Sequence, residues 1–213
     1  MRLVVFDFDG TLVNSNAVKL DMFYAYSRFD SGGVERMRRI LGRVAGDRYA
    51  IWDAYVRERD GISYHISTVR QIVQDFNESV NKAIALAPEM PGASALLQEL
   101  EKSGVHVALS SATPLEDLRS VLDQRSWIGR FNSVSGSPAT KFETLQYLIK
   151  TLDVRAEEVA VVGDGEDDRE SAGALGCNFY PVGEGRGTSP QSKIYNLHEL
   201  CGVLISSQRN YNG

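Results

Sequence analysis

Short apolar runs recur along the chain, and each ends at a glycine or a small polar residue. The first begins at Leu3 and leads into two aspartates, Asp7 and Asp9. Four later runs resemble it: Val105–Ser110, Phe131–Val134, Val159–Val162 and Cys177–Val182. Their β-branched and aromatic residues predict buried strands that end in turns.

Helical patterns separate these runs. They cover Ala93–Lys102, Leu115–Arg125, Lys141–Leu152 and Asp168–Leu175, and a short amphipathic piece follows at Leu197–Ile205. Strands that alternate with helices predict an α/β fold with a doubly wound parallel sheet, covered by helices on both faces. In such sheets ligands bind beyond the carboxyl ends of the strands, which is where Asp7 is expected.

The stretch from residue 16 to residue 87 interrupts this alternation. It has no strand pattern, and four of its segments have helical patterns: Ala17–Phe29, Val34–Gly42, Asp47–Arg59 and His65–Ala85. Glycine-containing pairs punctuate these segments. We therefore expect an α/β domain made of residues 1–15 and 88–213, and a helical domain inserted between them at residues 16–87.

Composition narrows the class of protein. The 213 residues are 43% hydrophobic and 24% charged, and no apolar stretch approaches the ~20 residues that span a bilayer. The formal net charge of −5 argues against non-specific nucleic-acid binding, which depends on Lys and Arg. No secretory signal pattern precedes Leu3, and Cys177 and Cys201 form no disulfide framework. We expect a cytoplasmic protein with no membrane role.

Asp7 and Asp9 are the first candidates for chemistry. If the strand persists through position 9, both side chains lie on the same side of the chain. Two carboxylates at such a short separation repel each other. Mg²⁺, which is held by carboxylates, waters and substrate phosphate, would balance their negative charge. The alternative is structural: Asp9-Gly10 is a turn, and Asp7 caps the segment that follows.

Three later strand ends carry further candidates. Ser111 follows the second strand, where a hydroxyl and backbone N–H groups can hold a phosphate or merely cap a helix. Lys141 begins a helix, where the helix dipole disfavours a cation, so either an anion holds it or it is a solvated surface lysine. Asp164 and Asp168 follow the fourth strand and indicate a cation site; an acidic helix start would explain Asp168 but not Asp164.

Taken in order, these four signals resemble the motifs of the haloacid dehalogenase superfamily of phosphohydrolases. The signature positions are Asp7, Asp9, Ser111, Lys141, Asp164 and Asp168. The resemblance implies a Rossmann-like core. The inserted segment resembles the helical cap of the phosphoglycolate phosphatase and β-phosphoglucomutase branch, which closes over the site and helps to choose the substrate.

The resemblance also implies roles. Asp7 would be the nucleophile that forms an aspartyl-phosphate, and Asp9 the general acid and base. Mg²⁺ would be held by Asp7, Asp164 and the carbonyl of Asp9. Ser111 and Lys141 would stabilise the phosphoryl group, with Thr11 and Ala112 completing the phosphate-binding set. Asp168 would anchor Lys141 or a metal-bound water, while Glu166 and Asp167 would face solvent.

The implied activity is that of a Mg²⁺-dependent phosphatase, a phosphoric monoester hydrolase acting on a sugar phosphate or a phosphoglycolate-like metabolite, as a monomer or homodimer. Several alternatives stay open. A phosphomutase would use the same nucleophile. A phospho-acceptor domain or a binding-only relative would not turn over a substrate. A phosphonate-cleaving enzyme would need a reactive lysine in the insertion, where only Lys19 and Lys82 occur. Asp9 argues against a dehalogenase, because halide departure needs no acid.

Other residues of tempting type are expected to be structural. His65, His106 and His198 show no metal-binding spacing. Trp52 and Tyr55 are spaced for core packing on a helix. The arginines at 36, 38, 39, 57 and 59 are typical of solvated helix faces, although one of them could reach a second anionic group of the substrate.

Overall fold

The computed structural model describes residues 1–44, 48–183 and 194–206. The chain divides into two compact units: residues 1–15 together with 85–213, and residues 16–84. The expected division fell at nearly the same positions, after residue 15 and before residue 88. Each unit is described by itself below.

The first unit contains a parallel sheet of five strands in the order β3-β2-β1-β4-β5. Its strands are β1 (Leu3–Phe6), β2 (His106–Pro114), β3 (Ser133–Ser137), β4 (Val159–Gly163) and β5 (Asn178–Pro181). All four residues of β1 are buried, and Val5 pairs with Ala108 on one side and with Val161 on the other. The strand order reverses beside β1, which creates a ligand-binding crevice at its carboxyl end.

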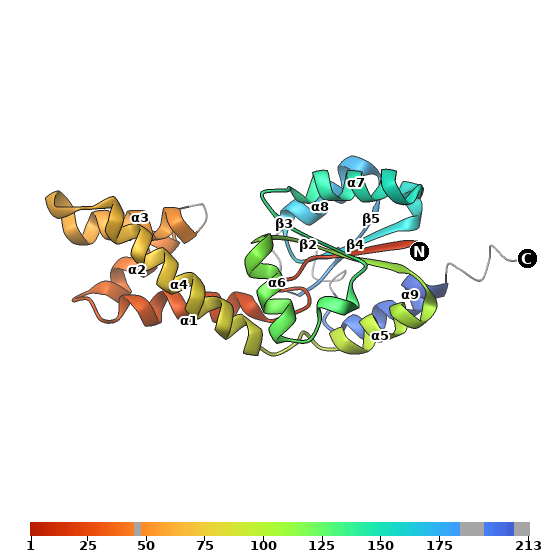
Figure 1. Cartoon of the computed structure of the whole chain (residues 1–213), viewed down its shortest axis with the longest axis horizontal. Helices are drawn as coiled ribbons and strands as arrows, with labels where there is room; N and C mark the ends of the chain where they lie inside the picture. The colour runs from red at the N-terminus through yellow and green to blue at the C-terminus, as the bar shows by residue number, and fades with distance from the viewer. Residues whose placement is uncertain (45–47, 184–193, 207–213) are drawn as a thin grey trace, which may run out of the picture. The chain divides into compact units, whose positions relative to one another are not determined.

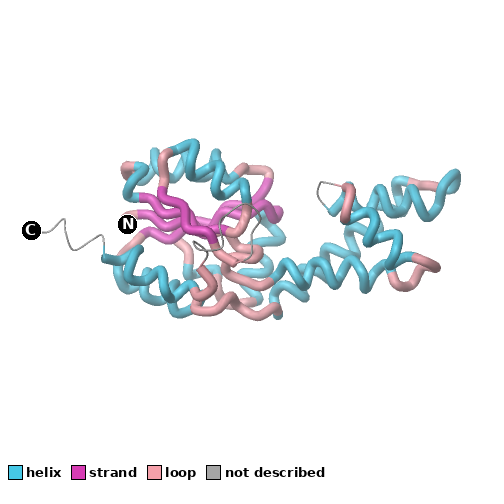
Figure 2. Tube along the Cα trace, turned by 180° about the vertical axis from the view of Figure 1, so that it is seen from behind, coloured by secondary structure: helices cyan, strands magenta, loops and turns pink. Residues whose placement is uncertain are grey.

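Helices cover both faces of this sheet (Figures 1 and 2). They are α5 (Ala93–Ser103), α6 (Leu115–Gln124), α7 (Lys141–Leu152), α8 (Glu166–Leu175) and α9 (Cys201–Ser206). Short 3₁₀ turns lie at η2 (Ile128–Arg130), η3 (Ala156–Glu158) and η5 (Leu197–Leu200). The α7 and α8 helices lie on one face, and α5, α6 and α9 on the other. The predicted α/β fold with a doubly wound parallel sheet is therefore confirmed.

One hydrophobic core joins the sheet to α7 and α8. Leu145 and Leu148 of α7 pack with Ala172 of α8 against Val5 and Val161, and all five are buried. Burial of such side chains contributes roughly 1.5–3 kcal/mol for each large aliphatic residue. This packing fixes the carboxyl ends of β1 and β4 relative to the starts of the two helices.

The start of α7 is fixed by a capping box. Thr140 Oγ1 accepts a hydrogen bond from the Glu143 N–H at 3.2 Å, and Glu143 Oε2 accepts one from the Thr140 N–H at 2.9 Å. Such pairs satisfy backbone donors that a helix start leaves without partners. Lys141 is therefore held at the first position of the helix, as its sequence pattern predicted.

The ends of β1, β2 and β3 differ from the predictions, and β3 ends at Ser137 rather than at Val134. β1 ends at Phe6, so the extended conformation expected through Asp9 is not continued as a strand. β2 continues to Pro114, four residues beyond the expected end at Ser110. Its pairing with β3 becomes irregular there, because Ser110 pairs with Ser135 while Pro114 pairs with Ser137. The small polar residues of this extension resemble a loop in sequence, and only the partner strand shows that they are extended.

The second unit is helical. Its elements are α1 (Ser15–Ser27), α2 (Gly33–Leu41), α3 (Arg48–Asp60), η1 (Gly61–Ser63) and α4 (Ile66–Leu86), with the ends of α1 and α4 reaching into the first unit. Asp47, the expected start of the third segment, lies outside the described residues. Trp52 and Tyr55 are 2% and 1% exposed, which confirms their core role. The Trp52 ring lies 5.3 Å from that of Phe76, and Phe23 lies 4.5 Å from Phe76.

The two segments that lead into and out of the helical unit run side by side within the first unit. The Asn14 N–H donates to the Pro88 carbonyl at 3.0 Å, and the Met90 N–H donates to the Leu12 carbonyl at 2.9 Å. Arg125 Nη1 donates to the carbonyls of Ala85 and Ala87 at 3.0 and 2.7 Å. Both of these connecting segments are therefore held in the α/β unit by hydrogen bonds.

Cys177 and Cys201 carry free thiols, and both residues are half-buried. In the ranges that the structure describes, no helix has both the length and the apolar character that crossing a membrane requires.

Candidate active site

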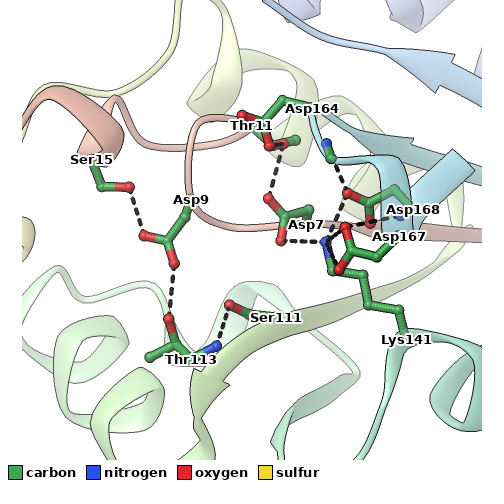
Figure 3. Close-up of polar contacts among 11 residues, drawn as sticks. Asp7, Asp9, Thr11, Ser15, Ser111, Thr113, Lys141, Asp164, Asp167 and Asp168 are labelled. Carbon is green, nitrogen blue, oxygen red and sulfur yellow. Dashed lines mark hydrogen bonds and ion pairs between the residues drawn. The ribbon is translucent and has the colours of Figure 1, made fainter. Parts of the chain in front are cut away.

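Asp7 lies directly after β1, and its backbone N–H donates to the Val162 carbonyl at 2.9 Å. The residue is only 4% exposed. Thr11 Oγ1 donates to one carboxylate oxygen, Oδ2, at 3.1 Å, and Lys141 Nζ lies 3.1 Å from the other, Oδ1 (Figure 3). The carboxylate is thus buried, oriented at both oxygens and paired with a cation.

Lys141 is surrounded by acidic side chains. Its Nζ lies 2.7 Å from Asp168 Oδ2 and 3.2 Å from Asp167 Oδ2, in addition to the contact with Asp7. Carboxylates of the protein therefore hold this lysine at a helix start. Asp167 has a side chain that is 56% exposed, as expected for a residue facing solvent, but its contact with Lys141 was not foreseen.

Burial and charge act in opposite directions on these groups. Burial raises the pKa of Asp7, the Lys141 ammonium opposes this, and Asp168, Asp9 and Asp164 raise it further. Burial lowers the pKa of Lys141, but the carboxylates of Asp7 and Asp168 outweigh it, and the pKa is raised. Burial also raises the pKa of Asp168, again against the effect of Lys141. Negative charge therefore exceeds positive charge in this site.

The turn from β4 into α8 brings two more carboxylates to Asp7. One oxygen each from Asp7, Asp164 and Asp168 lies within 4.8 Å of the others. Thr11 Oγ1 lies 3.5 Å from Asp164 Oδ1 and so bridges the two strand ends. A Cβ on Gly163 would lie 2.3 Å from the carboxyl group of Asp168, so only glycine admits this approach. A cluster of carboxylate oxygens is the donor set that suits Mg²⁺.

The side chain of Asp9 does not join this cluster. The sequence predicted that it would lie on the same side as Asp7, but the strand ends at Phe6 and Gly10 turns the chain with a φ of +80°. Ser15 Oγ donates to Asp9 Oδ1 at 2.6 Å, and Thr113 Oγ1 donates to Oδ2 at 2.8 Å. The carboxylate points toward these two hydroxyls rather than toward the Asp7 carboxylate (Figure 3). A role for Asp9 in metal binding would thus fall to its backbone carbonyl.

Ser111 lies in the extension of β2 and is 3% exposed. Its Oγ accepts a hydrogen bond from the Thr113 N–H at 3.1 Å, so its own O–H is available to a ligand. A cavity of about 500 Å³ opens beside it. Its lining residues are Ser111, Ala112, Ser137, Pro138, Ala139, Thr140, Lys141, Phe142, Asp167, Glu170, Ser171 and Ala174.

The structure thus brings together the expected residues Asp7, Thr11, Lys141, Asp164 and Asp168, and it places Ser111 and Ala112 with Lys141 along one cavity. Three contacts were missed by sequence reasoning: that of Asp167 with Lys141, and those of the Ser15 and Thr113 hydroxyls with Asp9. Thr113 had a usable signal, because it lies two residues after Ser111 and alternate residues of a strand share a face. Ser15 had no such signal, apart from lying six residues after Asp9 in the sequence.

Residues set aside in the sequence also have local partners. His106 Nε2 lies 3.3 Å from Ser133 Oγ, away from the carboxylate cluster. Within the helical unit, arginines form ion pairs with acidic residues of the same unit. These pairs are Arg38–Glu35, Arg39–Glu58, Arg57–Asp53, Arg59–Asp30 and Arg59–Asp60.

Comparison with known sequences agrees with the resemblance noted in the sequence. Residues 4–182 match the family of haloacid dehalogenase-like hydrolases. Phosphoglycolate phosphatase 1 of Pseudomonas aeruginosa is 29% identical over 217 residues, with 93% of this chain and 78% of that protein covered. A phosphoglycolate phosphatase of Pseudomonas fluorescens is 30% identical over 215 residues, with the same coverage. These relatives support the prediction of a phosphatase.

Solved structures share the fold. A predicted phosphoglycolate phosphatase of Haemophilus somnus aligns with a TM-score of 0.74 at 16% identity, covering 95% of this chain and 97% of that chain. A Thermotoga maritima protein provisionally named β-phosphoglucomutase aligns with a TM-score of 0.76 at 17% identity, covering 97% and 99%. With the match over residues 4–182, this agreement shows that the chain belongs to the haloacid dehalogenase-like hydrolases.

Proposed function

We propose that the protein is a Mg²⁺-dependent phosphatase that hydrolyses a small phosphorylated metabolite through an aspartyl-phosphate on Asp7. One observation carries the proposal. Asp7 is a buried carboxylate at the crevice of the sheet, oriented by Thr11 and paired with Lys141 at 3.1 Å. Clusters of charged groups whose pKa values are shifted by burial and by one another, when they lie in clefts, are typical of catalytic sites.

The orientation of Asp7 suits a nucleophile. Its two oxygens have different partners, a hydroxyl at Oδ2 and an ammonium at Oδ1, so the carboxylate cannot rotate freely. A positioned nucleophile saves much of the entropy of bringing two groups together. Attack on phosphorus forms an acyl phosphate and releases the alcohol, and water then hydrolyses the acyl phosphate.

Several groups would bind the phosphoryl oxygens in this proposal. Lys141 supplies positive charge, and the Ser111 O–H can donate because its oxygen accepts from the Thr113 N–H. The backbone N–H of Ala112 completes the set in this proposal, and Thr11, whose O–H donates to Asp7, would contribute by holding that carboxylate. Phosphoryl transfer depends on such charge neutralisation and alignment more than on covalent chemistry.

The carboxylates of Asp7 and Asp164, with the carbonyl of Asp9, would hold Mg²⁺. Oxygen donors from Asp7, Asp164 and Asp168 lie within 4.8 Å of one another, which fits a hard cation. When bound, Mg²⁺ supplies charge neutralisation for the phosphoryl group. Asp168 is assigned to Lys141 instead, because its Oδ2 lies 2.7 Å from Nζ and also accepts from the Gly165 N–H at 3.3 Å.

Asp9 would donate a proton to the departing alcohol and then accept one from the attacking water. Its carboxylate is half-buried, and the hydroxyls of Ser15 and Thr113 hold it apart from the Asp7 carboxylate. Asp7, in contrast, is fully inside the site and paired with the Lys141 ammonium. Two carboxylates in such different environments can perform different roles.

The substrate is proposed to be a sugar phosphate or a phosphoglycolate-like metabolite. The cavity of about 500 Å³ beside Ser111 and Lys141 is sized for a small molecule, and it adjoins the site through Lys141 rather than through Asp7 or Asp9, which do not line it. Curated relatives named phosphoglycolate phosphatase support the second option. The helical unit is proposed to act as a cap that contributes to this choice.

The test is phosphate release from a panel of phosphorylated metabolites and from 4-nitrophenyl phosphate, with Mg²⁺ and with EDTA. Asp7→Asn should abolish Mg²⁺-dependent release and should no longer trap labelled phosphate on the protein after acid quenching. Asp123→Asn, an exposed aspartate of α6, is the matched control and should behave as wild type. Turnover by Asp7→Asn near the wild-type rate would refute the proposal.

A further inference from the structure

Both oxygens of the Asp9 carboxylate accept hydrogen bonds from hydroxyl groups of other segments. Ser15 donates to Oδ1 from six residues away, and Thr113 donates to Oδ2 from the far end of β2, 104 residues away. The Thr113 contact is 2.8 Å long, a normal length for a hydroxyl and a carboxylate. Thr113 was not expected to belong to the site.

The position of Thr113 is fixed by its surroundings. It lies in the irregular part of the pairing between β2 and β3, a feature that commonly redirects side chains near active sites. Gly136 of β3 packs so closely that a Cβ there would lie 2.5 Å from the Thr113 carbonyl oxygen. Threonine is also restricted at χ1 by its branched Cβ. The hydroxyl is therefore presented to Asp9 by rigid structure.

Thr113 touches two residues of the proposed mechanism with different groups. Its side-chain hydroxyl donates to Asp9, while its backbone N–H donates to Ser111 Oγ at 3.1 Å. Replacing Thr113 by a residue without a hydroxyl, such as valine, removes the first contact and keeps the second. The contribution of the hydroxyl to Asp9 can thus be isolated.

We propose that Thr113 is a positioning residue that holds the Asp9 carboxylate in the orientation required for proton transfer to the leaving alcohol. The inference rests on the proposed function, in which Asp9 is the acid and base. Asp9 must alternate between a protonated and an ionised form, and a hydroxyl can donate to the ionised form and accept from the protonated one. A valine of the same shape can do neither.

The experiment compares Thr113→Val and Thr113→Ser with wild type on two aryl phosphates. 4-Nitrophenyl phosphate has a good leaving group that needs little protonation, whereas phenyl phosphate has a poor one. Thr113→Val should lose about tenfold in kcat on phenyl phosphate, the usual effect of one lost orienting hydrogen bond, and less than about threefold on 4-nitrophenyl phosphate. KM should change little for either substrate. Thr113→Ser should restore most of the lost kcat.

The matched control is Thr151→Val, which removes an exposed threonine hydroxyl of α7 and should leave both substrates unaffected. A double mutant supplies the decisive readout. In the Asp9→Asn background, Thr113→Val should cause no further loss on phenyl phosphate, because the residue through which it acts is already disabled. Thr113→Ala replaces Thr113→Val if circular dichroism shows that the valine disturbs the fold.

Equal losses on both substrates, or full additivity with Asp9→Asn, would show a general structural effect and overturn the inference. Unchanged kinetics of Thr113→Val would overturn it as well. A wild-type protein that releases no phosphate from these substrates or from any phosphorylated metabolite of the panel would instead refute the proposed function itself, and this inference with it. The failure of each proposal is thus distinguishable.

Discussion

Lys141 balances more than one buried acid. Asp7 and Asp168 are 4% and 2% exposed, and both approach its ammonium within 3.1 Å. Asp164 and Asp167 add further negative charge nearby (Figure 3). An ion pair of this kind is costly to break, because removing one partner leaves a buried charge without compensation.

Lys141→Met should therefore destabilise the protein as well as inactivate it. We expect the free energy of unfolding in EDTA to fall by about 3 kcal/mol, measured by urea denaturation at neutral pH. The loss should shrink at lower pH, because protonated carboxyls no longer need the cation. Lys150→Met, which alters an exposed lysine of the same helix, is the control and should change stability little. Equal stability of the two variants would contradict the assigned charge balance.

The raised pKa of Asp7 has a consequence for metal binding. Without metal, burial keeps part of the Asp7 population protonated near neutral pH, whereas a metal ligand must be ionised. Mg²⁺ binding should therefore release protons, and its apparent affinity should increase as the pH rises toward the pKa of Asp7. Calorimetric titration in buffers of different ionisation enthalpy measures the released protons. Asp123→Asn should release as many protons as wild type, and a binding enthalpy independent of the buffer would refute the prediction.

At the scale of single elements, the sequence indicated where the site would form but not how its side chains would turn. The apolar run before Asp7 predicted the position of β1, and the helical pattern that begins at Lys141 predicted the start of α7. The direction of Asp9 depended on the end of the strand at Phe6 and on the turn at Gly10, which alternation cannot show. The extension of β2 depended on pairing with β3, a contact distant in sequence.

Gly163 is an element-scale feature with a testable role. It ends β4 and leaves room for the Asp168 carboxyl group, which a Cβ would approach to 2.3 Å. Gly163→Ala should displace Asp168, weaken its contact with Lys141 and lower kcat/KM at least about tenfold. Phosphate release from 4-nitrophenyl phosphate at saturating Mg²⁺ measures the change.

The control for this change is Gly173→Ala. Gly173 lies in α8, and a Cβ there would extend into open space, so alanine should keep activity and stabilise the helix by about 0.5–1 kcal/mol. Both variants add one methyl group to the α/β unit, and only the first should affect turnover. Wild-type activity of Gly163→Ala would show that the Asp168 contact is dispensable.

At the scale of the whole molecule, the residues of the proposed mechanism all belong to residues 1–15 and 85–213. The helical unit has its own aromatic core around Trp52 and Phe76. The insertion was predictable because strand patterns vanish between residues 16 and 87. Its internal ion pairs were not all predictable, because some join residues far apart in sequence, as Arg39 with Glu58 and Arg59 with Asp30 do.

This separation predicts that the α/β unit can work without the helical one. Asn14 and Pro88 are hydrogen-bonded to each other at 3.0 Å, so a short Gly-Ser linker can replace residues 16–84 without straining the sheet. The shortened protein should fold, and it should hydrolyse 4-nitrophenyl phosphate within about tenfold of the full chain, because that substrate needs mainly the phosphoryl site. Its preferences among phosphorylated metabolites should flatten, because the proposed cap contributes to substrate choice. A folded shortened protein that keeps the full ranking of metabolites would assign that choice to the α/β unit instead.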